Sequence, residues 1–172
     1  AELCKLGPRP SGSDASEKQL QYITRHLEQH GWAIRRHSFT SPHGVKMTNL
    51  HALFVKEEAP SSELLLTCHI DTKINISDDF VGADDGASGA AVLMELARLL
   101  SGTEHAHRIE LVFFDGEEAV AERMTETDGL YGSKYDVERR GDNLPRYMIN
   151  LDMVGARNKT IQVPLFDSSP EL

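Results

Sequence analysis

The chain has 172 residues, which is enough to bury one hydrophobic core and too few for two ordinary domains, so we expect a single domain over residues 1–172. Apolar residues make up 40% of the sequence and charged residues 26%, a composition that excludes a disordered or fibrous protein. The net charge is −9 and the basic residues form no cluster larger than the pairs Arg35–Arg36 and Arg139–Arg140, which argues against nucleic acid and against a membrane as partners.

A helix is the first element that the sequence predicts, over residues 16–31 (SEKQLQYITRHLEQHG). Its apolar residues recur at helical spacing and share one face, and they are Leu20, Ile23 and Leu27. We expect Ser16 to cap the amino end of this helix and Gly31 to end it.

Strands of two kinds follow this helix. Residues 32–39 (WAIRRHSF) and 48–56 (TNLHALFVK) alternate between apolar and polar side chains, as half-buried strands do. Residues 63–70 (ELLLTCHI), 108–114 (RIELVFF) and 147–154 (YMINLDMV) are near-continuous apolar runs, which are typical of strands covered on both faces.

Helices separate these three buried strands. The stretch 80–100 tightens from a loop into a long apolar helix, and a short helix is expected around residues 133–141. Buried strands separated by helices indicate an α/β domain, which we expect to be a three-layer α/β/α sandwich with a mixed, largely parallel central sheet. Ligands of such sheets bind beyond the carboxyl ends of the strands.

One imidazole and several carboxylates follow the buried strands at that end. The first buried strand leads into His69 and Asp71, whose i, i+2 spacing points both side chains to the same face. The third contains Asp152, and the second is followed by Asp115, Glu117 and Glu118. An acid within an apolar strand is costly unless it is paired or metal-bound, which makes Asp152 the most informative of these residues.

Two adjacent aspartates, Asp84 and Asp85, open the helix after the first buried strand, within a run of small residues (GADDGASG). Helix capping would explain one aspartate but not two. So many carboxylates at one sheet edge would repel one another without a cation, and we therefore expect a metal ion there. Mixed imidazole and carboxylate ligands suit Zn²⁺, although Mn²⁺ or Co²⁺ would also bind such a set.

The motifs HIDT, GADDGASG, FFDGEEA, LYGS and NLDMVG, in this order and at these spacings, resemble the zinc aminopeptidases with a co-catalytic metal pair and their relatives, the glutaminyl cyclases. The resemblance implies a zinc exopeptidase-like fold that binds one or two zinc ions. It implies that His69 and Asp152 bind one zinc and that Asp85 bridges to the other. Glu118 would bind the second zinc. Relatives have a cis peptide after the bridging acid, so the bond Asp85–Gly86 is also expected to be cis.

The resemblance further implies the roles of two residues that do not bind metal. Glu117 would be the general base, and Asp71 would fix the tautomer of His69, a role that the i, i+2 spacing supports. Asp84 would hold the loop as a capping neighbour while Asp85 holds metal. The partner would be a peptide substrate with a free N-terminus.

Two reactions remain open for such a site. An aminopeptidase would hydrolyse the N-terminal peptide bond with metal-activated water, whereas a glutaminyl-peptide cyclotransferase would form N-terminal pyroglutamate and release ammonia. We favour the hydrolase, because Ala90 and Arg123 stand where cyclases tend to carry a cysteine and a tryptophan, and Cys68 is then unpaired. A non-catalytic relative kept for interactions is a third possibility, and it would predict eroded ligands.

The sequence departs from the family pattern at its last ligand, a histidine far downstream of the NLDMVG strand. No histidine follows Asp152, and His105 and His107 lie before the second buried strand, at its amino end. We therefore expect a C-terminally truncated fragment with low activity, whose final residues FDSSPEL begin a helix. The resemblance favours a secreted or periplasmic protein, although the first residues show no signal-peptide pattern.

Overall fold

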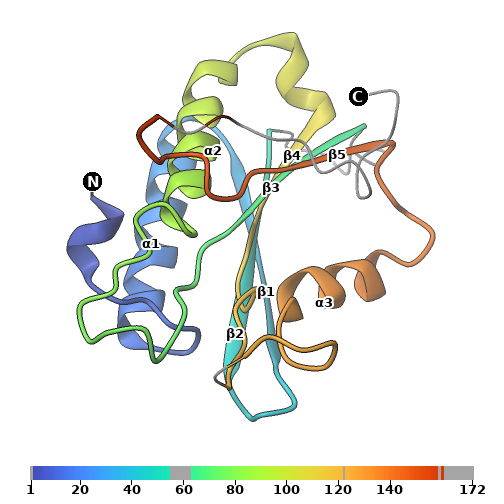
Figure 1. Ribbon diagram of the computed structural model, residues 1–172. Helices are drawn as coiled ribbons and strands as arrows, with labels where there is room; N and C mark the ends of the chain where they lie inside the picture. The colour runs from blue at the N-terminus through green and yellow to red at the C-terminus, as the bar shows by residue number, and fades with distance from the viewer. Residues whose placement is uncertain (1, 55–62, 122, 159, 161–172) are drawn as a thin grey trace.

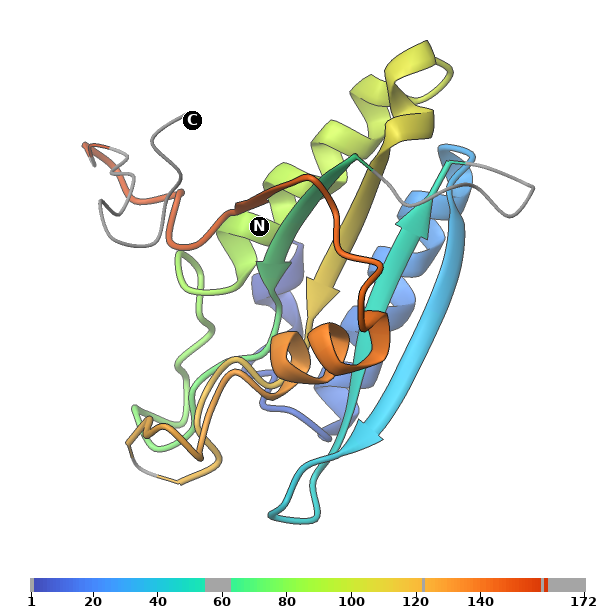
Figure 2. The same ribbon diagram turned by 90° about the vertical axis from the view of Figure 1, so that its right-hand side faces the viewer.

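The computed structural model describes residues 2–54, 63–121, 123–158 and 160. In these residues a central sheet separates two layers of helices, as expected (Figure 1). Helices α1 and α2 cover one face of the sheet, and α3 lies against the opposite face (Figure 2). The elements in chain order are η1 (Leu3–Leu6), α1 (Asp14–Gln29), β1 (Ala33–Thr40), β2 (Lys46–Leu53), β3 (Leu64–His69), α2 (Ala87–Leu100), η2 (Glu104–Arg108), β4 (Ile109–Phe114), α3 (Tyr131–Arg140) and β5 (Tyr147–Asn150).

The strands of the described residues form one sheet in the order β1-β2-β4-β3-β5. Strand β3 is parallel to both of its neighbours, β4 and β5, whereas β2 is antiparallel to β1 and to β4. The sheet is therefore mixed, and β2 alone runs against the common direction. The carboxyl ends of β3, β4 and β5 meet at one edge, where the sequence predicted the site.

Helix α1 begins and ends two residues earlier than predicted. The hydroxyl of Ser13 accepts the backbone N–H of Ser16 at 3.0 Å, and the backbone of Ser13 is extended. Ser13 is therefore the N-cap, and the prediction of Ser16 was wrong. The segment SGSDAS has a serine at both positions. Ser16 lies inside the helix, where it is buried, so Ser13 is the serine that can cap the helix.

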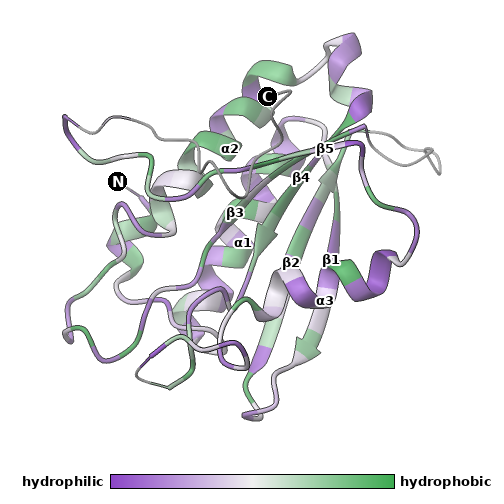
Figure 3. Cartoon of the chain, turned by 45° about the vertical axis from the view of Figure 1, so that its right-hand side comes forward, coloured by the Kyte–Doolittle hydropathy of each residue, from purple (hydrophilic) through white to green (hydrophobic). Residues whose placement is uncertain are grey.

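The main hydrophobic core lies between the sheet and helices α1 and α2. The apolar face predicted for α1 is buried there together with Trp32, whose ring N–H donates to the Ala97 carbonyl of α2 at 2.9 Å. A smaller cluster on the other face of the sheet consists of Leu65, Val112 and Phe114. Hydropathic colouring shows α2 as mainly apolar and α3 as mainly polar (Figure 3). Among the described helices, none has both the length and the apolar content needed to cross a membrane.

Strand β5 differs from the buried strand that its sequence predicted. It ends at Asn150, and all four of its residues are exposed. The backbone N–H of Leu151 still donates to the Thr67 carbonyl at 2.8 Å, but Asp152 lies beyond the strand. The apolar pattern misled because β5 is an edge strand that, within the described residues, pairs only with β3. The helix start expected in FDSSPEL lies outside the described residues.

Candidate metal centre

Three of the predicted metal ligands converge beyond the carboxyl ends of β3 and β5. The Nε2 atom of His69 lies 2.9 Å from Oδ1 of Asp85 and 3.5 Å from Oδ1 of Asp152. One possible ligand atom from each residue lies within 4.8 Å of the other two. Segments far apart in the sequence therefore place an imidazole and two carboxylates where one ion can reach all three.

The ring of His69 is buried among acceptors. Its side chain is 3% exposed, whereas the side chains of Asp85 and Asp152 are 33% and 41% exposed, so the cluster faces solvent on one side. Burial opposes a charge on the imidazole, but the carboxylates of Asp152, Asp71 and Asp85 outweigh burial and raise the pKa of His69.

Neither ring nitrogen of His69 has a hydrogen-bond partner of good geometry among the described residues. A metal ion between Nε2 and the two carboxylates would take the place of the proton that otherwise lies there, because a ligating imidazole is neutral. An imidazole with two carboxylates is also a donor set that zinc accepts. The residues present therefore fit a zinc ion.

Glycines bring the start of α2 up against β3. Gly86 has a φ of +86°, and a Cβ atom there would lie 2.9 Å from the Asp71 carbonyl oxygen and 3.2 Å from Cε1 of His69. A Cβ atom on Gly89 would collide with the carbonyl oxygen of Leu151. The run of small residues thus permits the close approach that places Asp85 beside His69.

The peptide bond between Asp85 and Gly86 is trans, so the expectation of a cis bond was wrong. The left-handed backbone of Gly86 makes the turn into α2 instead.

Asp84 and Ser88 anchor the segment that carries Asp152. Oδ1 of Asp84 accepts the backbone N–H of Gly155 at 2.7 Å. The hydroxyl of Ser88 donates to the Asp84 carbonyl at 2.5 Å and accepts the backbone N–H of Val154 at 3.0 Å. Asp84 therefore holds a loop, as expected, although α2 has no side-chain cap. Sequence reasoning missed Ser88, for which membership of the small-residue run was the only signal.

Asp71 joins the end of β3 to the loop after β4. Its carboxylate oxygens accept the backbone N–H groups of Glu117 and Glu118, each at 3.1 Å. Oδ1 of Asp71 also lies 3.5 Å from Nδ1 of His69, on the side of the ring away from Asp85 and Asp152. This is the position that the resemblance implied for the residue that orients the imidazole.

The two glutamates differ in their surroundings. Burial raises the pKa of Glu117 to about 7, and the charges of Asp71, Glu118 and Asp152 act in the same direction, against that of His69. Burial, with the charges of Asp85 and Asp71, also raises the pKa of Glu118.

Glu118 lies outside the three-residue cluster, and its Oε2 is 3.8 Å from Nζ of Lys73. Its assignment as a ligand stays a prediction. Lys73 was not anticipated from the sequence, where it only follows HIDT.

Two other sets of polar residues lie away from the cluster. His105 and His107 are in η2, which precedes β4, so they are at the amino end of that strand as expected. Asp115 follows β4 directly, but its carboxylate accepts the Ser11 hydroxyl at 2.6 Å and the Thr48 backbone N–H at 2.8 Å. These bonds give Asp115 a structural position between β4, β2 and the start of α1.

Comparisons with known proteins agree with this geometry. The chain is 30% identical to the glutaminyl-peptide cyclotransferase of Bothrops jararaca in an alignment 190 positions long, which covers 90% of this chain and 50% of that protein. The crystal structure of Macrostomum lignano glutaminyl cyclase matches with a TM-score of 0.80 and 27% identity, over 93% of this chain and 53% of that one. A Zn-dependent exopeptidase from Parabacteroides distasonis matches with a TM-score of 0.75 and 26% identity, over 92% and 60% of the two chains.

The chain thus spans about half the length of the curated relatives that it matches. The sequence model that matches it covers residues 49–171, a range that includes all the residues of the candidate metal centre. The relatives are glutaminyl cyclases and zinc exopeptidases, and both groups are enzymes. The chain belongs to peptidase family M28.

Proposed function

We propose that this chain carries the zinc centre of a glutaminyl-peptide cyclotransferase, which closes an N-terminal glutamine to pyroglutamate and releases ammonia. The observation that carries the proposal is the cluster of His69, Asp85 and Asp152 on a fold that superposes closely on a glutaminyl cyclase. The curated relatives with this name also favour the cyclase over the hydrolase that the sequence alone favoured.

His69, Asp85 and Asp152 would hold an ion at this cluster. The family resemblance assigns the single zinc of a cyclase to Asp85 and Glu118, so Glu118 would be a further ligand. When bound, zinc supplies a Lewis acid that polarises the oxygen of a carbonyl or amide group. The exposed fractions of Asp85 and Asp152 leave the cluster open on one side, where a peptide with a free N-terminus could enter.

Glu117 would move the proton. In the cyclisation the substrate's α-amine attacks its side-chain amide carbon, so a C–N bond forms and the amine must lose a proton. The bond to the amide nitrogen then breaks, and this nitrogen needs one proton to leave as ammonia. A carboxyl group with a pKa of about 7 can take the first proton and deliver it in the second step near neutral pH.

Asp71 would position both reacting parts of the site. It holds the backbone of Glu117 through a hydrogen bond and faces the ring nitrogen of His69 that is turned away from the other two carboxylates. Such partners fix the orientation of a ligating imidazole.

An exopeptidase is the second candidate. Cys68 is a free, buried cysteine, in line with the departure from cyclases noted in the sequence, and a Zn-dependent exopeptidase is among the structural neighbours. The same cluster and the same glutamate would then serve hydrolysis of the N-terminal peptide bond by metal-activated water.

The products of one incubation distinguish these proposals. Zinc-loaded protein is given a peptide that begins with glutamine, and the products are identified by mass spectrometry. We expect the pyroglutamyl peptide and ammonia, whereas release of free glutamine would contradict the cyclase and support the exopeptidase. The ratio of the two products is compared rather than the absolute rate.

The same assay tests the role of Glu117. Glu117→Gln should lower product formation by at least about 100-fold, as expected for loss of general acid–base catalysis. The matched control is Glu104→Gln, because Glu104 lies in η2 with a side chain that is 90% exposed. Equal rates for the two variants would contradict the assignment.

A further inference from the structure

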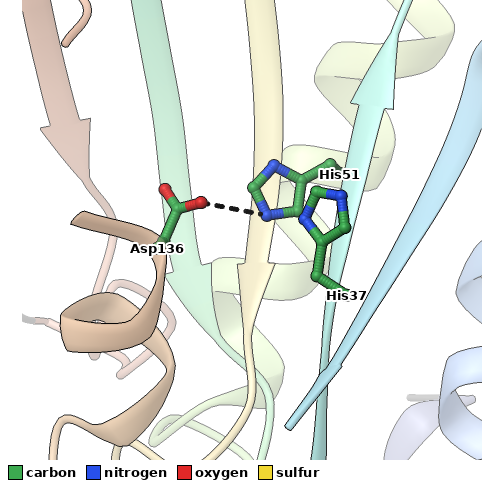
Figure 4. A group of neighbouring side chains, drawn as sticks. All are labelled: His37, His51 and Asp136. Carbon is green, nitrogen blue, oxygen red and sulfur yellow. Dashed lines mark ion pairs between the residues drawn. The ribbon is translucent and has the colours of Figure 1, made fainter. Parts of the chain in front are cut away.

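A second group of possible metal ligands lies on the α3 face of the sheet and shares no residue with the candidate zinc centre. It consists of His37 on β1, His51 on β2 and Asp136 on α3 (Figure 4). One possible ligand atom from each of the three lies within 4.8 Å of the other two. Register explains the histidine pair, because His51 pairs with Arg35 and His37 is two residues further along the same face of β1.

The tautomer of His51 is set by Glu110. Nδ1 of His51 lies 2.6 Å from Oε1 of Glu110. The same oxygen of Glu110 lies 2.9 Å from the guanidinium group of Arg140, so this carboxylate is an acceptor. Nδ1 must then carry a proton, which leaves Nε2 to present its lone pair when the ring is neutral. A carboxylate behind a histidine in this way is the usual companion of a metal-ligating imidazole.

That lone pair faces another acceptor. Nε2 of His51 lies 3.3 Å from Oδ1 of Asp136 and has no hydrogen-bond partner of good geometry among the described residues, and the His51 side chain is 1% exposed. Two acceptors that meet in a buried place are stabilised by a cation between them.

His37 supplies the third donor. Its ring centroid is 4.3 Å from that of His51, and its buried Nδ1 likewise has no hydrogen-bond partner among the described residues. One ring nitrogen of His37 is turned toward the ring of His51 (Figure 4). When neutral, this ring offers a nitrogen as the third ligand.

We propose that His37, His51 and Asp136 form a second site, which takes a divalent transition-metal ion such as zinc or copper. Ligands about 2.0–2.1 Å from a tetrahedral ion lie roughly 3.3 Å apart, which is the separation of His51 and Asp136. Two imidazoles favour zinc or copper over magnesium or calcium. The ion would link β1, β2 and α3, so its role would be to fasten α3 to the sheet.

Two guanidinium groups compete for Asp136. Arg139 lies 3.0 Å from Oδ1, the oxygen that faces His51, and Arg140 lies 2.6 Å from Oδ2. Arg140 is also 2.9 Å from Glu110 and only 10% exposed, so it stays in place. Arg139 is 35% exposed and can turn outward when an ion binds. The site therefore binds a metal less tightly than it would without Arg139.

The test uses the whole chain with the candidate zinc centre disabled by Asp85→Asn and Asp152→Asn. Calorimetric titration with Cu²⁺ should show one bound ion, and its electron paramagnetic resonance spectrum should show coupling to two ring nitrogens. Adding His37→Gln should weaken binding by about tenfold or more and leave one coupled nitrogen. Adding His105→Gln, whose side chain is 74% exposed in η2, should change neither result.

A second variant is expected to raise the affinity for Cu²⁺ rather than lower it, and this variant keeps all three proposed ligands. Arg139→Gln should tighten Cu²⁺ binding several-fold, because it removes the competing charge. Absence of a bound ion in the disabled background, coupling to fewer than two nitrogens, equal affinities with and without His37→Gln, or unchanged affinity in Arg139→Gln would each overturn the proposal. None of these outcomes bears on the zinc centre at His69.

Discussion

Oδ1 of Asp71 accepts the backbone N–H of Glu117 at 3.1 Å, which ties the segment after β3 to the segment after β4. The same oxygen lies 3.5 Å from Nδ1 of His69. One buried carboxylate therefore contacts both the imidazole of the candidate metal centre and the loop that carries the proposed proton carrier. Its charge also contributes to the raised pKa of Glu117.

Replacing this carboxylate should cost stability. Asp71→Asn leaves one oxygen for two backbone N–H groups and turns an amide NH₂ toward one of them, so the free energy of unfolding should fall by about 1–3 kcal/mol. Urea denaturation measures the change. The control is Asp78→Asn at an exposed position of the loop after β3, which should be nearly neutral. Similar losses in both variants would show that the two hydrogen bonds contribute little.

The approach of α2 to β3 predicts a specific effect at Gly86. Gly86→Ala combines a positive φ of +86° with a Cβ position 2.9 Å from the Asp71 carbonyl oxygen. Gly102→Ala has a similar φ of +74° but meets no atom within 4 Å, so it isolates the conformational cost of about 1–2 kcal/mol. We expect Gly86→Ala to be the more destabilising of the two in thermal unfolding and to weaken zinc binding, whereas Gly102→Ala leaves zinc binding unchanged. Equal effects of the two substitutions on both measurements would contradict the close approach.

Much of the fold and of the first cluster could be predicted from the sequence. The apolar runs of β3 and β4 identify buried strands, and parallel strands bring their carboxyl ends together, so His69 and the acidic loop after β4 had to meet. The exposure of β5 could not be predicted, because an apolar run does not say whether a strand is central or at an edge.

The second cluster was beyond the reach of sequence reasoning for a different reason. His37 and His51 become neighbours only through the register of a hairpin, and Asp136 joins them only when α3 docks. No pattern of residues that are close in the sequence predicts these contacts. The same holds for Ser88, whose two hydrogen bonds depend on the path of the segment after β5.

The pair of Glu110 and His51 predicts how stability depends on pH. The pKa of Glu110 is lowered from an ordinary 4.5 to about 2, so the unfolded chain binds its proton more readily than the folded one. The stabilisation is therefore complete above about pH 4.5 and is lost as the pH falls toward 2, by up to about 3 kcal/mol in all. Glu110→Gln should remove this part of the dependence, measured by urea denaturation between pH 6 and about 2.5. In contrast, Glu104→Gln at an exposed site should leave the curve of the unmodified chain unchanged.

The two predicted groups of zinc ligands should differ in how much they contribute to the affinity for zinc. Asp152 lies within the cluster around His69, whereas Glu118 lies outside it, with its carboxylate 3.8 Å from Nζ of Lys73. Asp152→Ala should therefore weaken zinc binding at this centre by about tenfold or more, and Glu118→Ala should have a much smaller effect. Calorimetric titration in a His37→Gln background, which removes the second cluster, measures both. Loss of binding in Glu118→Ala with binding retained in Asp152→Ala would reverse the assignment.

Anomalous diffraction at the zinc absorption edge, from crystals of this chain grown with zinc, tests the metal centre most directly. We expect a peak about 2.0–2.2 Å from Nε2 of His69 and from carboxylate oxygens of Asp85 and Asp152. The carboxyl group of Glu117 should face the open side of that ion. A zinc peak that lies elsewhere, or the absence of any peak between these three side chains, would contradict the proposed centre.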